Sequence, residues 1–399
     1  MKKLIHMMLS GVLLMSSCAY GGELDNQLQQ VIRQQRAKNH INAISLSIGL
    51  PRQKTIRNYV VGTVSQESKT PIRVNSLFQM GSITKNFTAV LILKLMESGK
   101  INLDAPIGKY FPEYPEWQNI TVRQLLNHTS GIYDYIDEPN WWDRVTKNQN
   151  KIFKPKALLA IAYKHKPYFV ANSGWHYSNT NYILLGLIIE KITEEPLSKS
   201  MSTLLKTAGM KDSYYLPVYS ENISIQIVHG YYLTFDNTKV NGSWGYGAAA
   251  LVSTPHQIVM WVRELFGGKI ISLQSLELLK NAVALDTGKA SKNFSTSAYG
   301  MGVFRMNTPA GIVWLTPGLT PGYRSLWVYM PCNGIGFAYS ASNSLIGMPF
   351  HVEMMQQVID TLLADKAVQE DITKYQHKTK LPNYCSQVKP AEKWSFVNF

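Results

Sequence analysis

The sequence predicts an α/β (α+β) fold: an antiparallel sheet flanked by helices and built from both chain ends, with a mostly helical domain inserted between them. Three observations indicate it. Alternating, strand-like runs occur at 43–50 and 55–65. Similar runs return after about residue 240, and the region between is dominated by apolar helical patterns and loops. The expected parts are 22–95 with 240–366 (α/β domain), 96–239 (helical domain) and 367–399 (C-terminal tail).

The first half of the chain contains the strongest helical signals. Residues 24–38 read as a helix, and the almost wholly apolar run from Phe87 to Met96 predicts a second helix that is buried on most sides. Gly99 stands where a helix C-cap glycine is expected. Thr121 and Gln124 predict a capping box, and 179–195 predicts another strongly apolar helix.

The second half predicts an antiparallel meander. Its strand-like segments are 299–306, 311–315, 323–330 and 334–342. Asn333-Gly334 predicts a hairpin turn between the last two. A closing helix near 350–364 would place one apolar face on the sheet, formed by Val352, Met355, Ile359 and Leu362. The tail beyond about residue 366 is polar and poorly periodic.

Residues 1–21 have the features of an export signal, with Lys2 and Lys3 before an apolar run and small residues. Cleavage after Ala19-Tyr20-Gly21 and lipidation of Cys18, which ends a lipobox-like segment, are both open. No later stretch reaches the roughly 18 apolar residues of a membrane span. We therefore expect an exported protein, periplasmic or secreted, with attachment to a bacterial membrane through lipidated Cys18 left open.

The formal net charge is +14, and removal of two leader lysines would make it 14 − 2 = +12. A basic exported protein is attracted to anionic surfaces such as wall polymers, although a lysine-rich surface also simply favours solubility. No basic cluster interleaved with aromatic residues indicates a nucleic-acid partner. Beyond Cys18, only Cys332 and Cys385 remain. They could pair in an oxidising compartment or stay unpaired, and their spacing does not decide.

A Ser-x-x-Lys pattern precedes the buried helix as Ser82 and Lys85, spaced so that both side chains share one helix face. A serine at a helix N-terminus lies near unpaired N–H groups that favour developing negative charge. A partly desolvated lysine loses its proton more readily and can accept that of the serine. The second copy, Ser386 and Lys389, has no buried helix behind it and reads as chance.

The segment "FQMGSITKNFTAVLILKLMESGKINLDAPIGKYFP", followed by "ITVRQLLNHTSGI", resembles the opening of the penicillin-recognising serine hydrolases. That group includes DD-carboxypeptidases, class C β-lactamases and family VIII-like esterases. The resemblance continues in order through "GWHYSNTNYILLGLIIEKITEEPL", "GYGAAALVSTPHQIVMWVRELFGG", "YGMGVF" and "TPGLTPGYRS". It covers most of the chain after the leader and implies a β-lactamase/DD-peptidase-like fold.

By this resemblance Ser82 is the acylated nucleophile, Lys85 its proton partner and Tyr177 the proton shuttle toward the leaving group. Asn179 would donate its amide to substrate, although it could also cap the following helix. The N–H groups of Ser82 and Leu319 would form the oxyanion hole.

The third expected element departs from the family pattern. Where the family usually has Lys or His, any residue and Gly, this chain has Thr316-Pro317-Gly318, with Thr316 and Gly318 as the expected substrate-binding positions. The missing cation puts recognition of D-Ala-D-Ala and turnover of β-lactams in doubt. Arg324 could supply the charge, and the second Thr-Pro-Gly at 320–322 permits a shifted alignment.

Other motifs point to no competing chemistry. There is no Gly-x-Ser-x-Gly elbow and no His-Glu-x-x-His zinc helix. The Gly245-x-Gly247-x-x-Ala250 segment is expected to serve close loop packing, and His128 a structural role. We expect neither metal nor organic cofactor.

The sequence therefore predicts an exported serine hydrolase that acts through an acyl-enzyme on a small peptide or ester, with peptidoglycan as the candidate source. A D-alanyl-D-alanine carboxypeptidase-like peptidase is the preferred reading. A β-lactamase or carboxylesterase of the same fold is the alternative, and a non-catalytic protein that binds wall fragments is the alternative of another class. The oligomeric state is not predicted.

Overall fold

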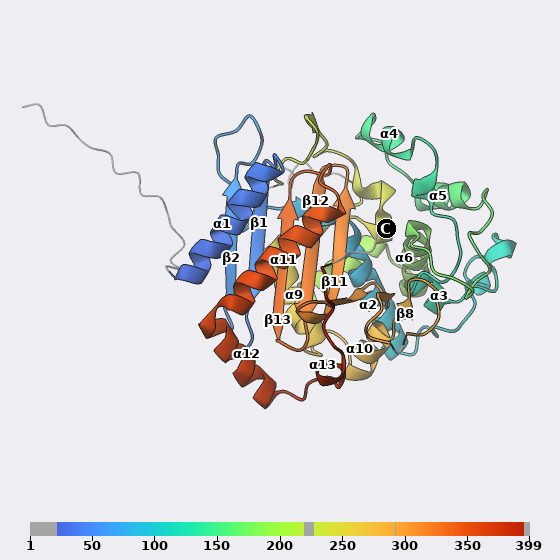
Figure 1. The fold of residues 1–399 in the computed structure, drawn as a ribbon. Helices are drawn as coiled ribbons and strands as arrows, with labels where there is room; N and C mark the ends of the chain where they lie inside the picture. Colours follow the sequence, from blue (N-terminus) through green and yellow to red (C-terminus); the bar gives the residue numbers. More distant parts are fainter. Residues whose placement is uncertain (1–21, 219–226, 292, 395–399) are drawn as a thin grey trace, which may run out of the picture.

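The computed structural model describes residues 22–218, 227–291 and 293–394 (Figure 1). The predicted export signal and Cys18 lie outside the described residues. The centre of the fold is an eight-stranded antiparallel sheet with the order β2-β1-β13-β12-β11-β10-β9-β8. Its strands are β1 (Ala43–Gly49), β2 (Ile56–Gly62), β8 (Val283–Ala284), β9 (Ala298–Tyr299), β10 (Phe304–Thr308), β11 (Gly311–Thr320), β12 (Tyr323–Met330) and β13 (Ile335–Ala341).

Both ends of the chain meet in this sheet, because β1 pairs with β13 from Ile44 opposite Ala341 to Gly49 opposite Gly336. One face is covered by α1 (Glu23–Lys38) and α11 (Met348–Ala364), and the other by α9 (Pro255–Phe266) (Figure 1). Side chains alternate between the faces. Leu326 therefore belongs to the apolar core under α1 and α11, whereas its neighbour Trp327 belongs to the core under α9. The predicted fold class is confirmed.

A mostly helical region lies beside the sheet, and we propose that it is the inserted domain 96–239. Its central helix is α6, which packs against α2, α3, α5 and α7 and is buried along most of its length. The elements concerned are α2 (Thr84–Glu97), α3 (Val122–Leu126), α4 (Trp141–Thr146), α5 (Pro155–Ala162), α6 (Asn179–Thr193) and α7 (Leu197–Thr207), with the 3-10 turns η2 (Ile107–Lys109), η3 (Pro115–Trp117) and η4 (Tyr135–Asp137).

Shorter elements complete the described chain. They are β3 (Phe78–Gln79), β4 (Tyr214–Tyr215) and β7 (Leu251–Ser253) in a three-stranded sheet, the hairpin β5 (Tyr231–Tyr232) with β6 (Phe235–Asp236), the turns η1 (Gly81–Ile83), η5 (Gly242–Trp244) and η6 (Tyr246–Ala248), and the helices α10 (Leu273–Lys280), α12 (Lys366–Lys378) and α13 (Tyr384–Gln387). Within the described ranges, no helix is both long and apolar enough to cross a membrane.

Several local predictions can be compared with the structure. The capping box at Thr121 is present, and Gly99 has φ +72° directly after the C-cap of α2, as a helix-ending glycine requires. The hairpin containing Gly334 has a four-residue loop, 331–334, rather than a tight Asn-Gly turn. The polar segment after residue 366 forms α12, because Val368 and Ile372, one turn apart, are both buried.

Cys332 and Cys385 form a disulfide with an S–S distance of 2.04 Å. It closes a separation of 53 residues and ties α13 to the loop between β12 and β13. Of the two alternatives that the spacing left open, the structure has the paired one.

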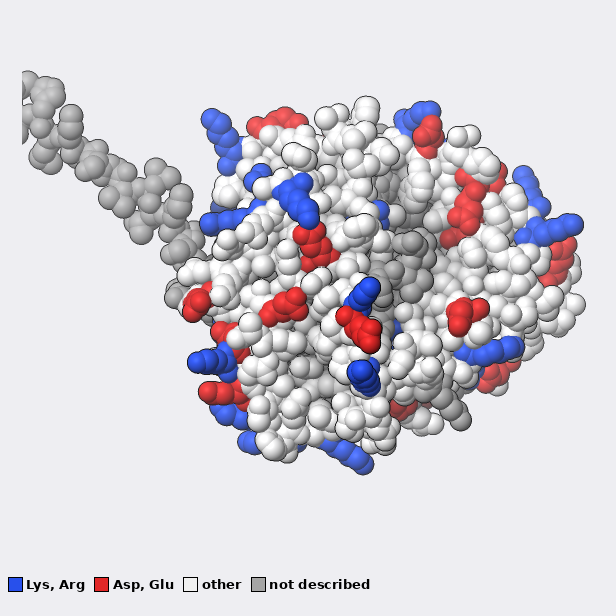
Figure 2. Space-filling view, viewed as in Figure 1, with Lys and Arg blue, Asp and Glu red and all other residues white. Residues whose placement is uncertain are grey.

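The positive net charge is not gathered on the face shown in Figure 2. Lys and Arg side chains are spread over it with Asp and Glu between them. Elsewhere in the described chain, ion pairs such as Lys38 with Glu353 and Lys269 with Glu264 balance individual lysines. On this face the charge therefore forms no continuous basic patch.

Candidate active site

Ser82 lies in η1, the single 3-10 turn that leads into α2, and Lys85 lies in the first turn of α2. The Nζ of Lys85 is 3.1 Å from the Oγ of Ser82. Ser82 is partly exposed, whereas Lys85 is 0% exposed. Ten successive residues from Thr84 to Leu93 lie in the buried part of α2, so the helix holds the lysine rigidly against the serine.

Lys85 is surrounded by acceptors and aromatic rings. Its Nζ donates to Asn179 Oδ1 at 2.7 Å and to the carbonyl of Ala248 at 3.2 Å, and lies 4.7 Å from the centre of the Tyr177 ring. Burial lowers the pKa of Lys85 to about 7, and the charge of Asp134 opposes that shift. Because the amine is partly neutral near pH 7, it can accept a proton from Ser82.

The glycine-rich segment 245–250 places the carbonyl of Ala248 beside Lys85. A Cβ on Gly247 would lie 2.5 Å from the carbonyl oxygen of Tyr182, so only glycine lets the segment approach α6 this closely. The Gly247 carbonyl also accepts a hydrogen bond from Thr88 in α2, at 2.7 Å. Close loop packing, as predicted, is thus what this segment provides.

Asp134 completes the polar core of the site, and the sequence analysis does not identify it as a site residue. Its Oδ2 accepts a hydrogen bond from Asn179 Nδ2 at 2.8 Å, so Asn179 bridges Lys85 and Asp134. Burial raises the pKa of the Asp134 carboxyl to about 7. The amide of Asn179 therefore also positions the lysine, and its predicted contact with substrate stays a prediction.

Tyr177 is held in place through the residue that follows it. The Ser178 N–H donates to Nδ1 of His128 at 3.2 Å, and the His128 ring lies 4.5 Å from the Tyr177 ring. His128 is completely buried, and burial together with Lys85 lowers its pKa well below 6.5. His128 is therefore a neutral positioning residue, in line with the structural role expected for it.

The Tyr177 hydroxyl is a neutral phenol. Burial raises its pKa well above 10, with Tyr299 adding to the shift and a hydrogen bond with Ser82 opposing it. That hydrogen bond places the hydroxyl beside the serine, where it can pass a proton without becoming a stable phenolate.

Strand β11 approaches the serine through its free edge. Its ladder with β10 begins at Leu315, so among the described strands residues 316–320 are paired only with β12. Pro317, which lacks an N–H, lies in this stretch, as a proline on a strand edge can.

The turn containing Ser82 and strand β11 are in direct contact. Gly81 has φ +54°, and a Cβ there would lie 2.6 Å from the Leu319 nitrogen. A Cβ on Gly318 would lie 2.0 Å from the Met80 carbonyl oxygen. Residues 316–318 therefore stand at the predicted third element, and the shifted alignment on 320–322 is not needed.

These residues surround a cavity of about 250 Å³. It is lined by Ser82, Ile136, Trp142, Tyr177, Asn179, Trp244, Phe304, Pro317, Gly318, Leu319, Arg324 and Met348. Thr316 is not part of this lining: it is 2% exposed and its hydroxyl donates to the Gly302 carbonyl at 3.3 Å. The structure therefore brings together the predicted site residues except Thr316, places the candidate cation Arg324 in the same lining, and adds Asp134.

This fold, with a serine in a cavity beside a strand edge and a buried lysine in contact with that serine, defines a serine hydrolase of the β-lactamase and penicillin-binding fold. Residues 28–361 match the family described as Beta-lactamase, and the chain belongs to that family. The resemblance inferred from the sequence is confirmed.

Individual relatives agree with the family. The chain is 28% identical over 288 residues to "Penicillin-binding protein 4*" of Bacillus subtilis, an alignment that covers 67% of this chain and 61% of that relative. It thus spans about three fifths of the length of this curated relative. A D-amino acid amidase from Ochrobactrum anthropi SV3 superposes with a TM-score of 0.76 at 24% identity, covering 86% of this chain and 99% of that one. A D-stereospecific amidohydrolase from Streptomyces sp. superposes with a TM-score of 0.72 at 25% identity, covering 84% of this chain and 97% of that one.

Proposed function

We propose that the protein is an exported peptidase of the D-alanyl-D-alanine carboxypeptidase type, which cleaves cell-wall peptides through an acyl-enzyme at Ser82. The observation that carries the proposal is the buried Lys85, with its pKa lowered to about 7 and its Nζ 3.1 Å from the Oγ of Ser82, which lines a cavity of about 250 Å³. A buried lysine of this kind is costly unless it is used.

Acylation follows from the geometry. Lys85, as the free amine, takes the Ser82 proton while Oγ attacks the carbonyl carbon of the substrate. The oxygen of the tetrahedral intermediate would lie on the N–H groups of Ser82 and Leu319, whose strand contacts the serine turn through Gly81. Tyr177, beside Ser82, passes a proton to the departing amine, and the proton on Lys85 replaces it. The C–N bond breaks and the ester to Ser82 remains.

Deacylation reverses these proton transfers. Water takes the position of the departed amine, gives one proton through Tyr177 to Lys85, and attacks the Ser82 ester carbonyl. Ser82 leaves as an alcohol after it regains a proton from Lys85. Each proton that leaves a nucleophile thus returns to a leaving group, so the cycle needs no other acid or base.

The choice of substrate is supported by the relatives and by the leader. One relative is named a penicillin-binding protein, and one structural neighbour is a D-stereospecific amidohydrolase. A peptide that ends in D-amino acids is a substrate on which both descriptions converge. The leader-like residues 1–21, and the net charge of 14 − 2 = +12 that remains without the two leader lysines, favour a location next to anionic wall polymers.

The test is a substrate panel with the purified protein. We expect hydrolysis of a diacetyl-Lys-D-Ala-D-Ala peptide, release of D-Ala, and an acyl adduct on Ser82 in the mass spectrum of the quenched reaction. The L-Ala-L-Ala peptide is the matched control and should be cleaved at least about tenfold more slowly. Faster turnover of nitrocefin or of p-nitrophenyl esters would favour the β-lactamase or carboxylesterase alternative. Binding of wall peptides with no adduct from any substrate would favour the non-catalytic alternative, which the missing cation at Thr316 motivates.

Removal of the charge at Asp134 is expected to shift the pH profile. The Asp134 carboxylate raises the pKa of Lys85, so Asp134→Asn should lower it and make the free amine available at lower pH. The rise of kcat/KM with pH is therefore expected about one pH unit below that of the wild type.

The control for this prediction is Asp143→Asn, which removes an exposed carboxylate that pairs with Lys147. It should leave the profile in place. A shift of the Asp134→Asn profile to higher pH would contradict the electrostatic argument.

A further inference from the structure

Arg324 lies where two cavities of the site adjoin. The first contains Ser82 and has a volume of about 250 Å³, and the second has about 290 Å³. Both are lined by Trp142, Leu319 and Arg324. Leu319 and Arg324 are direct partners across β11 and β12, so the arginine stands one strand behind the predicted oxyanion donor.

Arg324 has no acidic partner in the described part of the chain. Among the residues that line the first cavity it is the only charged one. Its Nε donates to the Ser344 carbonyl at 3.3 Å. Burial lowers its pKa to about 10, so the guanidinium is still charged at neutral pH. Asp143, in the second cavity, is paired with Lys147 at 2.7 Å.

A partly buried cation without a counter-ion is costly unless a ligand supplies the charge. Its planar donors suit a carboxylate, which they can bind through two parallel hydrogen bonds. The cavity lining offers such a ligand no other cation, because Thr316 occupies the position where the family usually has Lys or His.

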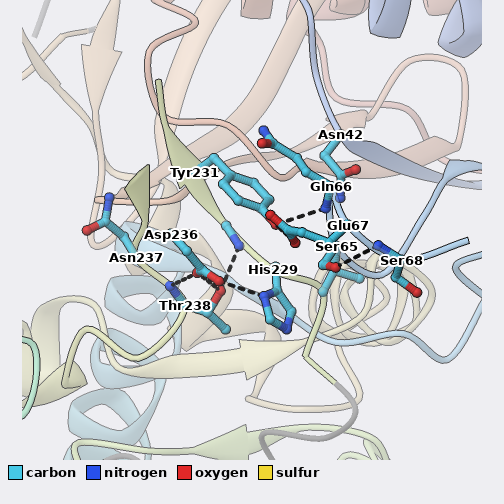
Figure 3. Close-up of polar contacts among 12 residues, drawn as sticks. Asn42, Ser65, Gln66, Glu67, Ser68, His229, Tyr231, Asp236, Asn237 and Thr238 are labelled. Carbon is cyan, nitrogen blue, oxygen red and sulfur yellow. Dashed lines mark hydrogen bonds and ion pairs between the residues drawn. The ribbon is translucent and has the colours of Figure 1, made fainter. Parts of the chain in front are cut away.

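The Ser344 carbonyl that accepts from Arg324 belongs to a larger set of hydrogen bonds, part of which, around Tyr231 and Asp236, is drawn in Figure 3. Ser344, whose carbonyl accepts from Arg324, donates its N–H to the Tyr231 carbonyl at 2.9 Å. The Tyr231 hydroxyl accepts from the Gln66 N–H at 2.9 Å, and Asp236 accepts from the Thr238 N–H at 2.8 Å. Tyr231 of the hairpin β5–β6 thus contacts both Gln66 and Ser344, and through Ser344 it supports the carbonyl that accepts from the guanidinium.

We propose that Arg324 binds a carboxylate on the leaving group of the substrate, in place of the cation that is missing from position 316. This rests on the proposed function, in which the residue released is the carboxyl-terminal one. Arg324 then makes the enzyme a carboxypeptidase rather than a general amidase, because a substrate with a neutral end leaves the guanidinium desolvated and unpaired.

The test compares aryl esters that share one acyl group and differ only at the leaving group, m-carboxyphenyl against m-carbamoylphenyl. We expect the wild type to prefer the carboxylate about 10- to 100-fold in kcat/KM. Arg324→Gln should reduce this preference to near 1, and Arg324→Lys should keep part of it. A third ester, with the carboxylate on the acyl group, should show no such dependence on Arg324.

The matched control is Lys156→Ala, since Lys156 is an exposed cation of α5 that lines neither cavity, and its removal should leave the preference in place. Labelling of Ser82 by a fluorophosphonate shows that each variant is folded. A wild type without preference, an Arg324→Gln variant that keeps it, or dependence on Arg324 only for the acyl-side carboxylate would each overturn the inference. If the D-Ala-D-Ala peptide is not cleaved but the ester preference depends on Arg324, the proposed function fails and this assignment stands.

Discussion

Ser82→Ala is expected to reduce kcat/KM on every substrate of the wild type by about 10⁴-fold or more, because removal of a covalent nucleophile leaves only binding and oxyanion stabilisation. The residual rate should show no burst and no acyl adduct. The change removes one partly exposed oxygen, so the thermal unfolding temperature should stay close to that of the wild type. Steady-state kinetics and mass spectrometry on the same preparation measure both.

The chain contains its own control for this substitution. Ser386 and Lys389 repeat the Ser-x-x-Lys pattern in the tail, where Ser386 lies in the short, exposed helix α13. Ser386→Ala should therefore leave both rate and adduct as in the wild type. If Ser82→Ala retained the adduct, the nucleophile would lie elsewhere and the assignment of the cavity would be wrong.

The two Ser-x-x-Lys copies also show what could be predicted from sequence. Both copies have the same four-residue pattern. They differ because an apolar helix follows Ser82, and the hydrophobic periodicity of the sequence reveals that helix. The antiparallel meander and the helices 24–38 and 179–195 were predictable for the same reason. Local patterns show which face of a helix or strand is buried. Because burial lowers the pKa of a lysine, burial distinguishes the Ser-x-x-Lys copy that can be catalytic from the one that cannot.

The rest of the site depends on long-range contacts that no local pattern reports. Asp134 meets Asn179 across 45 positions, and Asn179 meets Lys85 across 94. The sequence names Arg324 as a candidate for the missing positive charge. The direction of its side chain, however, depends on Ser344 and on the pairing of β12 with β11. The family resemblance predicts Thr316 as a substrate-binding residue, whereas its hydroxyl donates to the Gly302 carbonyl. Which polar groups converge is set by tertiary packing, and a motif resemblance supplies only candidates.

Lys85→Met is expected to lower kcat/KM by about 10²–10⁴-fold, the range for loss of a general base. It should also remove the rise of kcat/KM with pH on the acid side of the profile. In the wild type the pKa of Lys85 is lowered to about 7, so the ammonium form, which cannot accept a proton, dominates below that pH. The wild-type kcat/KM should therefore rise from pH 5 to about 8 and then level off. Met fills much of the same volume in the buried site and adds no charge, so the variant should fold.

Lys94→Met is the matched control, because Lys94 lies in the same helix but is exposed. It should preserve both the rate and the rise with pH. A Lys85→Met variant that kept the wild-type profile would make Tyr177 the base, which would require a phenolate at neutral pH. The buried Tyr177 hydroxyl has its pKa raised well above 10, so such a phenolate would need compensation by a positive charge. Lys85 itself lies 4.7 Å from the Tyr177 ring and could provide that charge, but the substitution removes it. Loss of the pH-dependent limb in Lys85→Met is therefore the result that separates a lysine base from a tyrosine base.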